Sequence, residues 1–433
     1  MTTSITLGMI GCGNIGSEFV DVLDERRAAI AATSGIDLRL TRIAVADLGK
    51  PRSSAVCSRT LTDDVDEVID DDEIDIVVEL AGDVGGIRDI VLRTLRSGKS
   101  VVTGNKALIA SSGPELFAQA RESGVDLLFE AATVAGVPIL RPLRESLVGE
   151  EVTSIAGILN GTTNYVLSRM ADESMDYDAA LAQAQALGLA EPDPTADVEG
   201  IDSASKLAIL SSVAFNHSVP FSAVHSEGIV GMDRADMEIA AGFGYAIKSL
   251  AVAEARWDDG QLVPCVRAQI FPALVPLSHP LASVHDAFNA VFVRGSDVGE
   301  LMFYGQGAGR RPTASAILGD VVDAAHNRIS GTSRTVPVGP AAAIGSVDDM
   351  CYPYYLRLDV ADSPGVLSEV SGVFGVHGIS LRVVEQHDSV AGVARVVFVT
   401  YRTTERAFRA AMADLVSCAS VRRTGQVLRI FAD

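Results

Sequence analysis

The sequence has few cysteines, and their spacing predicts neither a disulfide framework nor a zinc site. The five cysteines of the 433-residue chain are Cys12, Cys57, Cys265, Cys351 and Cys418, and none stands in a CxxC pair. Scattered cysteines without pair spacing argue against both kinds of site. Each of them is therefore expected to be a small side chain of the core.

Long apolar runs and a surplus of positive charge are also missing. No run approaches the roughly 18 residues that a membrane span needs, and residues 1–5 lack the basic patch of a signal peptide. Lys and Arg number 35 against 56 Asp and Glu, a net charge of −21. Phosphate contacts need clustered basic residues, so a nucleic-acid partner is disfavoured. We expect a cytoplasmic globular protein of two or three domains, with no membrane or nucleic-acid partner.

The first 135 residues alternate short apolar runs with amphipathic segments. The apolar runs predict strands at 4–10, 38–45, 75–80, 100–103 and 126–129, and helices are expected between them, for example at 87–96 and 115–123. Strands that alternate with helices of this length predict βαβ units and a parallel sheet. Residues 1–135 are therefore expected to form an α/β domain with a Rossmann-type, doubly wound sheet. The acidic stretch 63–75 is interpreted as a solvated helix and turn.

A glycine-rich turn follows the first predicted strand. It consists of Gly11, Cys12, Gly13, Asn14, Ile15 and Gly16 and leads into an apolar helix. Such glycines allow a tight turn and the close approach of a pyrophosphate to a helix N-terminus. With a strand before it and a helix after it, the motif predicts dinucleotide binding by Gly11, Gly13, Asn14, Ile15 and Gly16.

The end of the second strand carries mixed signals for the choice of cofactor. Asp47 can bond the ribose hydroxyls of NAD, whereas an arginine would favour the 2′-phosphate of NADP. Ala46 supplies no such charge, but Lys50 and Arg52 follow closely and could meet a phosphate. NAD and NADP therefore both stay open at this point.

The rest of the chain divides into three predicted parts. Residues 136–330 are expected to form an α+β domain for substrate binding, catalysis and dimerisation, with helices at 177–187 and 202–215 and a strand at 262–271. Residues 331–350 are rich in Gly, Ser, Pro and Ala and predict a linker. Residues 351–433 predict the order βαββαβ, which is that of a ferredoxin-like domain, and we expect them to fold as their own unit.

An acidic turn before the helix at 202–215 is the most specific chemical pattern. Four carboxylates, Glu191, Asp193, Asp197 and Asp202, precede one lysine, Lys206. Asp202 and Lys206 are four residues apart and share a helical face, which continues as an apolar stripe. An unpaired buried ammonium is costly, so this lysine should be held by its acidic neighbour, in a setting suited to proton transfer. The alternative is an ordinary surface ion pair.

The segment 184–206 resembles the signature of homoserine dehydrogenases at every fixed position. Four further blocks, 101–106, 159–165, 276–280 and 303–309, resemble the same family in the same order. The resemblance implies that Lys206 transfers the proton and that Lys106 lies at the reacting oxygen. It implies substrate contacts for Glu191, Asp197 and Asp202. It also implies cofactor contacts for Thr103, Lys106, Gly188 and Gly307, beside Asp47 and the glycine turn.

The family pattern has departures and further implications. Relatives usually carry arginine, alanine and tyrosine where this chain has Ala46, Gly104 and Leu189, so NAD use and a slightly different pocket are expected. The stretch 130–138 matches a loop whose backbone carbonyls hold a monovalent cation, and the resemblance implies a sodium site at Glu130, Thr133, Ala135 and Val137.

The tail resembles an ACT domain, with the sequence 362–367 at its first strand-to-helix turn. This implies an amino-acid effector, threonine first, at an interface between paired copies. The alternative is a domain used only for assembly. A homodimer or homotetramer is expected.

We therefore expect an NAD(P)H-dependent enzyme that interconverts L-homoserine and L-aspartate 4-semialdehyde in threonine and methionine biosynthesis. Two alternatives stay open: a paralogue that acts on another small amino alcohol or semialdehyde, and an amino-acid sensor without turnover. Since every proposed catalytic residue precedes the linker, a chain ended near Ser346 is expected to stay folded and active.

Overall fold

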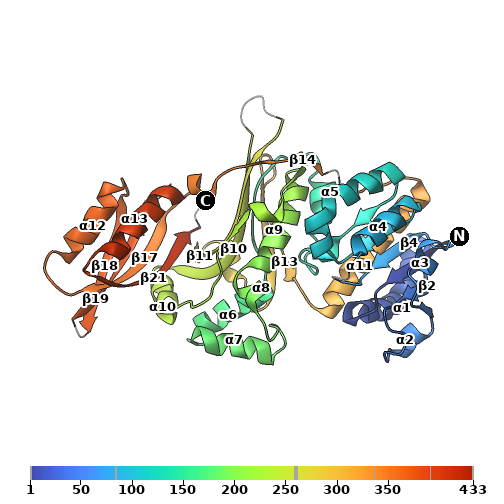
Figure 1. Cartoon of the computed structure of the whole chain (residues 1–433), viewed down its shortest axis with the longest axis horizontal. Helices are drawn as coiled ribbons and strands as arrows, with labels where there is room; N and C mark the ends of the chain where they lie inside the picture. The colour runs from blue at the N-terminus through green and yellow to red at the C-terminus, as the bar shows by residue number, and fades with distance from the viewer. Residues whose placement is uncertain (1, 83–84, 258–261, 337, 391, 432–433) are drawn as a thin grey trace.

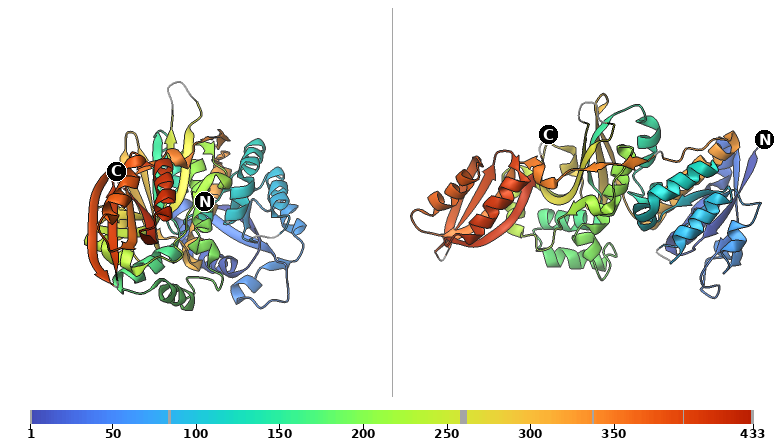
Figure 2. Two further views of the ribbon diagram at one scale, coloured as in Figure 1. Left: turned by 60° about the vertical axis from the view of Figure 1, so that its left-hand side comes forward. Right: turned by 45° about the horizontal axis from the view of Figure 1, so that its top comes forward.

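The computed structural model describes the chain except residues 1, 83–84, 258–261, 337, 391 and 432–433. Three regions follow one another along its longest axis (Figures 1 and 2). We call them the N-terminal region (residues 1–135 together with helix α11, Arg310–Ser330), the central region, and the tail (residues 351–433). No helix of the described residues combines the length and the apolar character needed to cross a membrane.

The N-terminal region contains a six-stranded parallel sheet in the order β3-β2-β1-β4-β5-β6. This is the strand order of a dinucleotide-binding Rossmann fold, so the predicted fold is confirmed. The strands are β1 (Thr3–Ile10), β2 (Ile36–Ala44), β3 (Thr60–Thr62), β4 (Ile76–Glu79), β5 (Ser100–Thr103) and β6 (Leu127–Leu128). The helices, besides α11, are α1 (Asn14–Ser34), α2 (Ser54–Cys57), α3 (Asp66–Ile69), α4 (Ile87–Arg96) and α5 (Lys106–Ser123).

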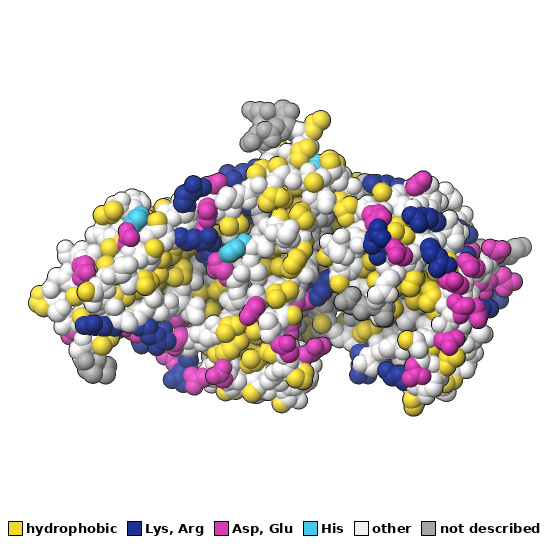
Figure 3. Space-filling view, in the orientation of Figure 1, with side chains coloured by type: hydrophobic (Ala, Val, Ile, Leu, Met, Phe, Trp, Pro, Cys, Tyr) yellow, Lys and Arg dark blue, Asp and Glu magenta, His cyan; other side chains and the backbone are white. Residues whose placement is uncertain are grey.

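Successive side chains of each strand point to opposite faces of this sheet and pack into two apolar cores, one on each face. Val102 packs with residues of α1 and α11, whereas its neighbour Val101 packs with residues of α4 and α5. The helix predicted at 115–123 begins much earlier, at Lys106, where the Asn105 side chain caps it. Pro114 lies inside the helix. The acidic stretch forms α3 and a turn, and acidic side chains gather at this end of the molecule (Figure 3).

The central region and the tail share one mixed sheet. Its main path is β13-β12-β7-β10-β11-β21-β17-β19-β18, and β9 and β15 also pair with β11. The central strands are β7 (Val152–Ile158), β8 (His217–Ser218), β9 (Val224–Ser226), β10 (Tyr245–Arg256), β11 (Cys265–Pro276), β12 (Phe288–Gly295) and β13 (Gly299–Gln306). The α-helices of the central region among the described residues are α6 (Gly161–Asp172), α7 (Tyr177–Ala186), α8 (Thr195–Val198), α9 (Ile201–Ala214) and α10 (Arg234–Gly242).

The strand predicted at 262–271 is shifted along the chain to β11. Leu262, the first residue of the predicted strand, is 91% exposed and precedes the observed strand. Instead β11 runs on to Pro276, and its residues from Ala268 to Val275 are all buried. An apolar residue next to a turn marks a strand end poorly, because many apolar side chains remain on the surface.

The tail has the predicted order of elements. They are β17 (Tyr354–Ala361), α12 (Val366–Val376), β18 (Leu381–Val390), β19 (Val393–Thr400), α13 (Glu405–Ser417) and β21 (Val421–Ile430), with a short pair formed by β16 (Cys351–Tyr352) and β20 (Thr403–Thr404). The sheet order β21-β17-β19-β18 is that of a ferredoxin-like domain, so this fold is also confirmed.

The sheet of the tail continues into the central region, and whether the tail folds as its own unit stays a prediction. Strand β21 pairs in parallel with β11, with Ala273 opposite Arg429 and Leu274 opposite Ile430. One apolar core contains Leu274 of β11 together with Tyr355 and Leu428 of the tail. The βαββαβ pattern predicts the internal fold of such a unit. It does not predict that an edge strand of this unit will pair with a strand of another region.

The predicted linker is also held against the rest of the chain. Within residues 331–350, β14 (Gly339–Ala341) pairs with β8 and β15 (Ala343–Ile344) pairs with β11. The Thr335 hydroxyl group accepts a hydrogen bond from Leu127 N, 3.0 Å away. The segment is therefore packed along the central region, although residue 337 lies outside the described residues.

Candidate active site

The glycine turn has the backbone geometry that a pyrophosphate requires. Gly11 has φ +88°, and a Cβ there would lie 2.4 Å from the backbone of Ala81, so only glycine fits. A Cβ on Gly13, by contrast, would point into open space at the start of α1, whose first N–H groups have no side-chain cap. Asn14, Ile15 and Gly16 form the first turn of this helix. The residues present therefore fit a dinucleotide at this position.

The end of β2 places Asp47 on an exposed loop. Its carboxylate accepts the N–H of Gly49 at 2.8 Å. The Arg52 guanidinium donates to the carbonyls of Asp47, at 2.7 Å, and Lys50, at 3.0 Å. Arg52 also interacts with the Cys12 thiol in the glycine turn, whose pKa is raised by burial. The loop thus carries one carboxylate and one guanidinium beside the expected ribose position.

Strands β4 and β5 end in a buried polar cluster next to the glycine turn. Glu79 accepts hydrogen bonds from the Thr103 hydroxyl group at 2.6 Å and from Ala81 N at 2.7 Å, and burial raises the pKa of Glu79. Thr103 in turn accepts the N–H of Asn105. These bonds hold the segment 103–105, and Lys106 follows it as the first residue of α5. The cluster therefore determines where the Lys106 side chain starts.

The acidic turn leads into α9 through a left-handed residue. Gly200 has φ +80° and precedes Ile201, the first residue of the helix. Asp202 and Lys206 then share one face, and their ion pair has Nζ and Oδ2 2.7 Å apart. The Lys206 ammonium also donates to the Leu159 carbonyl at 2.9 Å. Both side chains are about one-eighth exposed, so this is not the ordinary surface pair that was the alternative.

Asp202 joins the two predicted catalytic lysines, which come from different regions of the molecule. Its other carboxylate oxygen, Oδ1, pairs with Lys106 of α5. Burial alone would raise the pKa of Asp202, but the charges of Lys206 and Lys106 hold it well below its usual range. Asp202 is therefore ionised at neutral pH, and the two ammonium groups face the same small site.

Asn160 completes this cluster and was not identified in the sequence. Its side-chain amide donates to Asp197 Oδ1 at 2.7 Å and to Asp202 Oδ2 at 3.1 Å, while its oxygen caps α6 by accepting Thr163 N. The order Asn-Gly-Thr-Thr before a helix is an N-cap signal. The signal predicts the cap, but it does not show which carboxylates the amide group will reach.

Glu191 and the glycines of the same loop lie at the margin of the cluster. Glu191 is exposed, and in the described part of the chain no hydrogen bond or ion pair joins its carboxylate to Asp202 or the lysines. Gly188 has φ +72° at the end of α7, and the Leu189 carbonyl accepts the Thr162 hydroxyl group at 2.8 Å. The loop is thus anchored to the N-terminus of α6, while Glu191 points to solvent.

The segment 130–137 contacts α11 through the bond from Glu130 N to Asp320, and it contacts Gly307 through Ala135 N. The Glu130 carboxylate is used within the protein, where it accepts the N–H groups of Ile139, Leu140 and Arg141 at 2.7 to 2.9 Å. Ala135 N donates to the Gly307 carbonyl. Among the described residues, no group of three His, Cys, Asp or Glu is placed to hold a metal ion. The cation ligands predicted at Glu130, Thr133, Ala135 and Val137 are backbone carbonyls, and that set stays a prediction.

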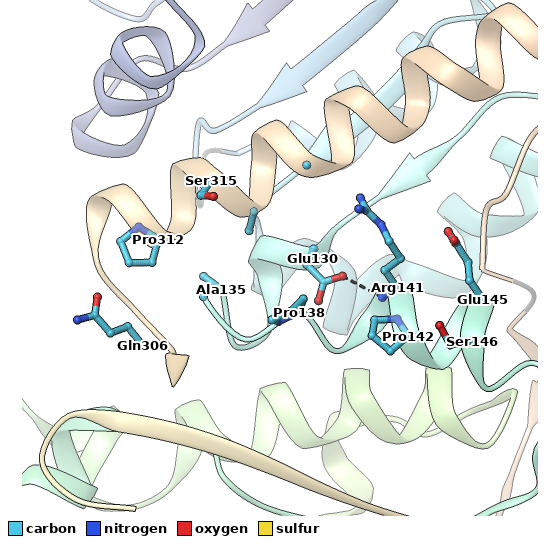
Figure 4. A pocket seen from close by; sticks show the side chains of 13 residues that line it. Glu130, Ala135, Pro138, Arg141, Pro142, Glu145, Ser146, Gln306, Pro312 and Ser315 are labelled. Atoms are coloured by element: carbon cyan, nitrogen blue, oxygen red, sulfur yellow. Dashed lines mark hydrogen bonds between the residues drawn. The ribbon is translucent and has the colours of Figure 1, made fainter. Parts of the chain in front are cut away.

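A cavity of about 680 Å³ opens beside this segment, between residues 135–146 and α11 (Figure 4). Glu130, Arg141, Glu145 and Gln306 line it. Neither Lys106 nor Lys206 is among the lining residues. The proposed chemistry therefore lies at the Lys106–Asp202–Lys206 cluster and not in this cavity.

Comparisons with known proteins agree along the whole chain. Family models match at residues 11–130 (homoserine dehydrogenase, NAD binding domain), 138–322 (homoserine dehydrogenase) and 354–419 (ACT domain). The homoserine dehydrogenase of Mycobacterium leprae is 44% identical over 99% of this chain and 98% of its own. The chain belongs to the homoserine dehydrogenase family. It is an oxidoreductase with a nicotinamide-binding domain and an ACT domain.

Further homoserine dehydrogenases support this assignment. The protein of Corynebacterium glutamicum is 41% identical over 100% of this chain and 96% of its own. A solved homoserine dehydrogenase from Thiobacillus denitrificans is 36% identical, has a TM-score of 0.91 and covers 99% of both chains. The resemblance found in the sequence is therefore confirmed.

Proposed function

We propose that the chain interconverts L-homoserine and L-aspartate 4-semialdehyde with NAD(P)H, a step towards threonine and methionine. The observation that carries this proposal is the cluster in which one buried, ionised carboxylate, Asp202, pairs with Lys106 and Lys206. Two ammonium groups at one point suit an oxygen atom that changes between carbonyl and hydroxyl, because that oxygen gains negative charge and a proton during reduction.

Each residue has a defined task in this proposal. When bound, the nicotinamide ring supplies or accepts the hydride at C4 of the substrate. Lys206 donates the proton to the carbonyl oxygen during reduction and takes it back during oxidation, while Lys106 stabilises the charge on that oxygen. Asp202 orients both ammonium groups, and Asn160 orients Asp202. Glu191 and Asp197 supply negative charge for the substrate ammonium group.

The contacts of Lys206 support its role. Asp202 and the Leu159 carbonyl take two of the three N–H groups of its ammonium, as far as the described residues show. The remaining donor is available to a substrate oxygen. A lysine whose side chain is held at two points loses little further freedom when it transfers a proton, so its geometry is largely preorganised.

Initial rates with aspartate semialdehyde, homoserine and a panel of other small semialdehydes, each with NADH and NADPH, test the proposal. Rapid turnover of aspartate semialdehyde and homoserine is expected. Faster turnover of another semialdehyde would favour a paralogue with a different substrate, for which Leu189 and Gly104 leave room. Absence of turnover with every substrate would leave an amino-acid sensor.

We further propose that the tail binds an amino-acid effector, with threonine as the first candidate. A cavity of about 360 Å³ lies at the turn 361–367 and against β18 and β19. Gly365 has φ +93° and begins α12 without a side-chain cap, so N–H groups are available to a carboxylate. Threonine titration of the wild type and of Gln386→Ala, a change in the cavity wall, tests this. Weaker inhibition is expected in the variant.

Three further parts of the proposal concern the setting of the enzyme. A homodimer or homotetramer is expected, which light scattering would measure. Sodium bound by the carbonyls of Glu130, Thr133, Ala135 and Val137 would be structural, so replacing sodium by a larger organic cation should lower thermal stability and leave the chemical step unchanged. A cytoplasmic location completes the proposal and is open to fractionation.

A further inference from the structure

A buried arginine of the tail is held between carboxylates of two regions. Arg429 lies on β21 and is 2% exposed. Its guanidinium donates to both oxygens of Glu227, each at 2.7 Å, and to both oxygens of Glu405, at 2.8 and 2.9 Å. It also lies over the ring of Phe271, 4.9 Å from the centroid. Two bidentate pairs leave this side chain a single orientation.

Glu227 belongs to the central region and lies on a short extended segment. We call residues 226–229 the strap. Glu227 N donates to the Ile270 carbonyl of β11 at 2.8 Å. Burial would raise the pKa of Glu227, but hydrogen bonds from His225 and Arg429 lower it to about 2. The carboxylate is thus fully charged at neutral pH, and Arg429 is its bidentate partner.

The strap packs directly on the turn that precedes the catalytic helix. The Ser226 hydroxyl group donates to the Glu199 carbonyl and Ile229 N donates to the Val198 carbonyl, both at 2.8 Å. A Cβ on Gly228 would lie 2.2 Å from the Val198 carbonyl oxygen. The turn at 198–200 therefore has no room to move unless the strap moves with it.

The same turn determines where the catalytic side chains begin. Gly200 is followed by Ile201 and Asp202, and Lys206 lies one helical turn further on. A Cβ on Gly200 would lie 2.6 Å from the Ser226 hydroxyl oxygen, so strap and turn are in close contact on this side as well. A displacement of the strap is thus passed to the start of α9.

We propose that Arg429 is a positioning residue for the dehydrogenase reaction: through Glu227 and the strap it holds the turn 198–200 and thereby Asp202 and Lys206. The inference rests on the proposed function and deepens it, because it gives the tail a physical route to the site. An effector that moves β21 would disturb the reaction along this route. Cofactor binding would be spared, since the glycine turn belongs to another sheet.

Glu227→Gln tests the route, because it keeps the shape of the side chain and removes its charge. We expect kcat/KM for homoserine to fall about tenfold, mainly through kcat, since small displacements of catalytic groups are costly. The Kd of the cofactor should stay within about twofold of the wild type. Hydrogen–deuterium exchange in residues 196–206 should rise. Ser226→Ala, which removes the hydrogen bond to the Glu199 carbonyl, should shift the same readouts in the same direction.

Tyr355→Phe is the matched control. It removes another hydrogen bond between the tail and the central region, from the Tyr355 hydroxyl group to Asp236 at 2.9 Å, which does not involve the strap. Its kcat/KM and its exchange in 196–206 should stay within about twofold of the wild type.

Two results would overturn the proposal. One is wild-type kcat in folded Glu227→Gln, or in Ser226→Ala if the first variant does not fold. The other is an equal loss in Tyr355→Phe, which would mean that general loosening of the tail explains the effect. A wild-type enzyme that does not oxidise homoserine overturns the proposed function instead, and the exchange measurement still shows whether the strap holds the turn.

Discussion

The N-terminal region and the tail are both built from βαβ units, but they are attached to the central region in different ways. The N-terminal sheet shares no strand with the mixed sheet, and at the active site its link is the side-chain pair of Lys106 with Asp202. The tail adds its last strand to the central sheet and buries Arg357 and Arg429 against central carboxylates. The tail is therefore joined to the central sheet through backbone hydrogen bonds as well as side chains, whereas the N-terminal sheet is a separate sheet.

The difference has an energetic consequence. Removing one partner of a buried ion pair costs about 3–5 kcal/mol, because the remaining charge stays in a poorly solvated place. An exposed pair contributes about 0–1 kcal/mol. The charges at the tail junction are among the most buried of the described residues, with Asp236 at 0% and Arg357 at 1% exposed. We therefore expect removal of a charge at the junction with the tail to lower the free energy of unfolding more than removal of a charge at an exposed surface pair.

The largest effect is expected where the N-terminal and central regions meet, at Lys206. Lys206→Ala should lower kcat by about 10² or more, since proton transfer by a positioned group contributes about 10²–10⁴. Cofactor binding should be retained, because the glycine turn is untouched. Ser205→Ala is the control: it changes the preceding residue of α9, whose hydroxyl group bonds only Ile201 of its own helix among the described residues. Lys206→Ala with most of its turnover and a normal fold would contradict the assignment.

Lys106→Ala should also impair the chemical step.

Truncation after Ser346 tests the attachment of the tail. The sequence alone predicted a folded, active remainder, but the structure leads to the opposite expectation. The truncated chain would leave Glu227 and Asp236 without their arginines and would expose Leu274 and its neighbours in the core. Loss of one such arginine alone costs about 3–5 kcal/mol. Thermal unfolding of both chains gives the answer. An unchanged midpoint, with activity retained, would show that the tail is separable after all.

Much of the fold could be predicted because its periodicity is local. Alternating strands and helices identified the Rossmann sheet, and the order βαββαβ identified the tail. The position of α11 and the pairing of β21 with β11 could not be predicted, because they join segments far apart in the sequence. Val321 of α11 lies in the core with Leu7 of β1. No local pattern separates that burial from packing within the central region.

The site was predicted unevenly for a similar reason. The i, i+4 spacing of Asp202 and Lys206 is local and could be read from the sequence. The pairing of Lys106 with Asp202 spans 96 residues, and only the family resemblance placed both lysines at one site. Asn160 was missed because its amide serves α6 and the acidic turn together. The predicted roles of Glu191 and of the cation-binding carbonyls require a bound substrate and a bound sodium ion, respectively, so these roles stay predictions.

In the N-terminal region we expect a moderate effect, on the preference for NADPH over NADH. Ala46→Arg should shift the ratio of kcat/KM for NADPH over NADH upward by about tenfold or more, because guanidinium and phosphate pair strongly. In the wild type we expect NADH to be used at least as well as NADPH, since the Arg52 guanidinium is held by the carbonyls of Asp47 and Lys50. Arg52→Met is the control, and it should leave this ratio little changed. A wild-type preference for NADPH above about tenfold, lost in Arg52→Met, would assign the phosphate to Arg52 instead.

The last prediction concerns how the free energy of unfolding depends on pH. Asp320 in the N-terminal region and Glu227 at the junction with the tail should contribute dependences of opposite sign. In α11, burial and the nearby Glu130 carboxylate raise the pKa of Asp320 from 3.8 to about 7. The folded state therefore keeps a proton that the unfolded state releases, so this contribution to stability is present below pH 4 and is lost as the pH rises through 7. Asp320→Asn keeps an acceptor for Glu130 N and removes the titration.

Asp320→Asn should therefore gain stability relative to the wild type as the pH rises from 4 to 7, and the gain should be largest at the upper end of this range. Glu227 has the reverse sign: its pKa falls from 4.5 to about 2, so its contribution is present above 4.5 and disappears as the pH falls through 2. The cost of Glu227→Gln should accordingly be full at pH 7 and shrink in acid. Urea unfolding of both variants between pH 3 and 8 gives the two slopes. Slopes of the same sign would show that one of these carboxylates has been given the wrong charge state.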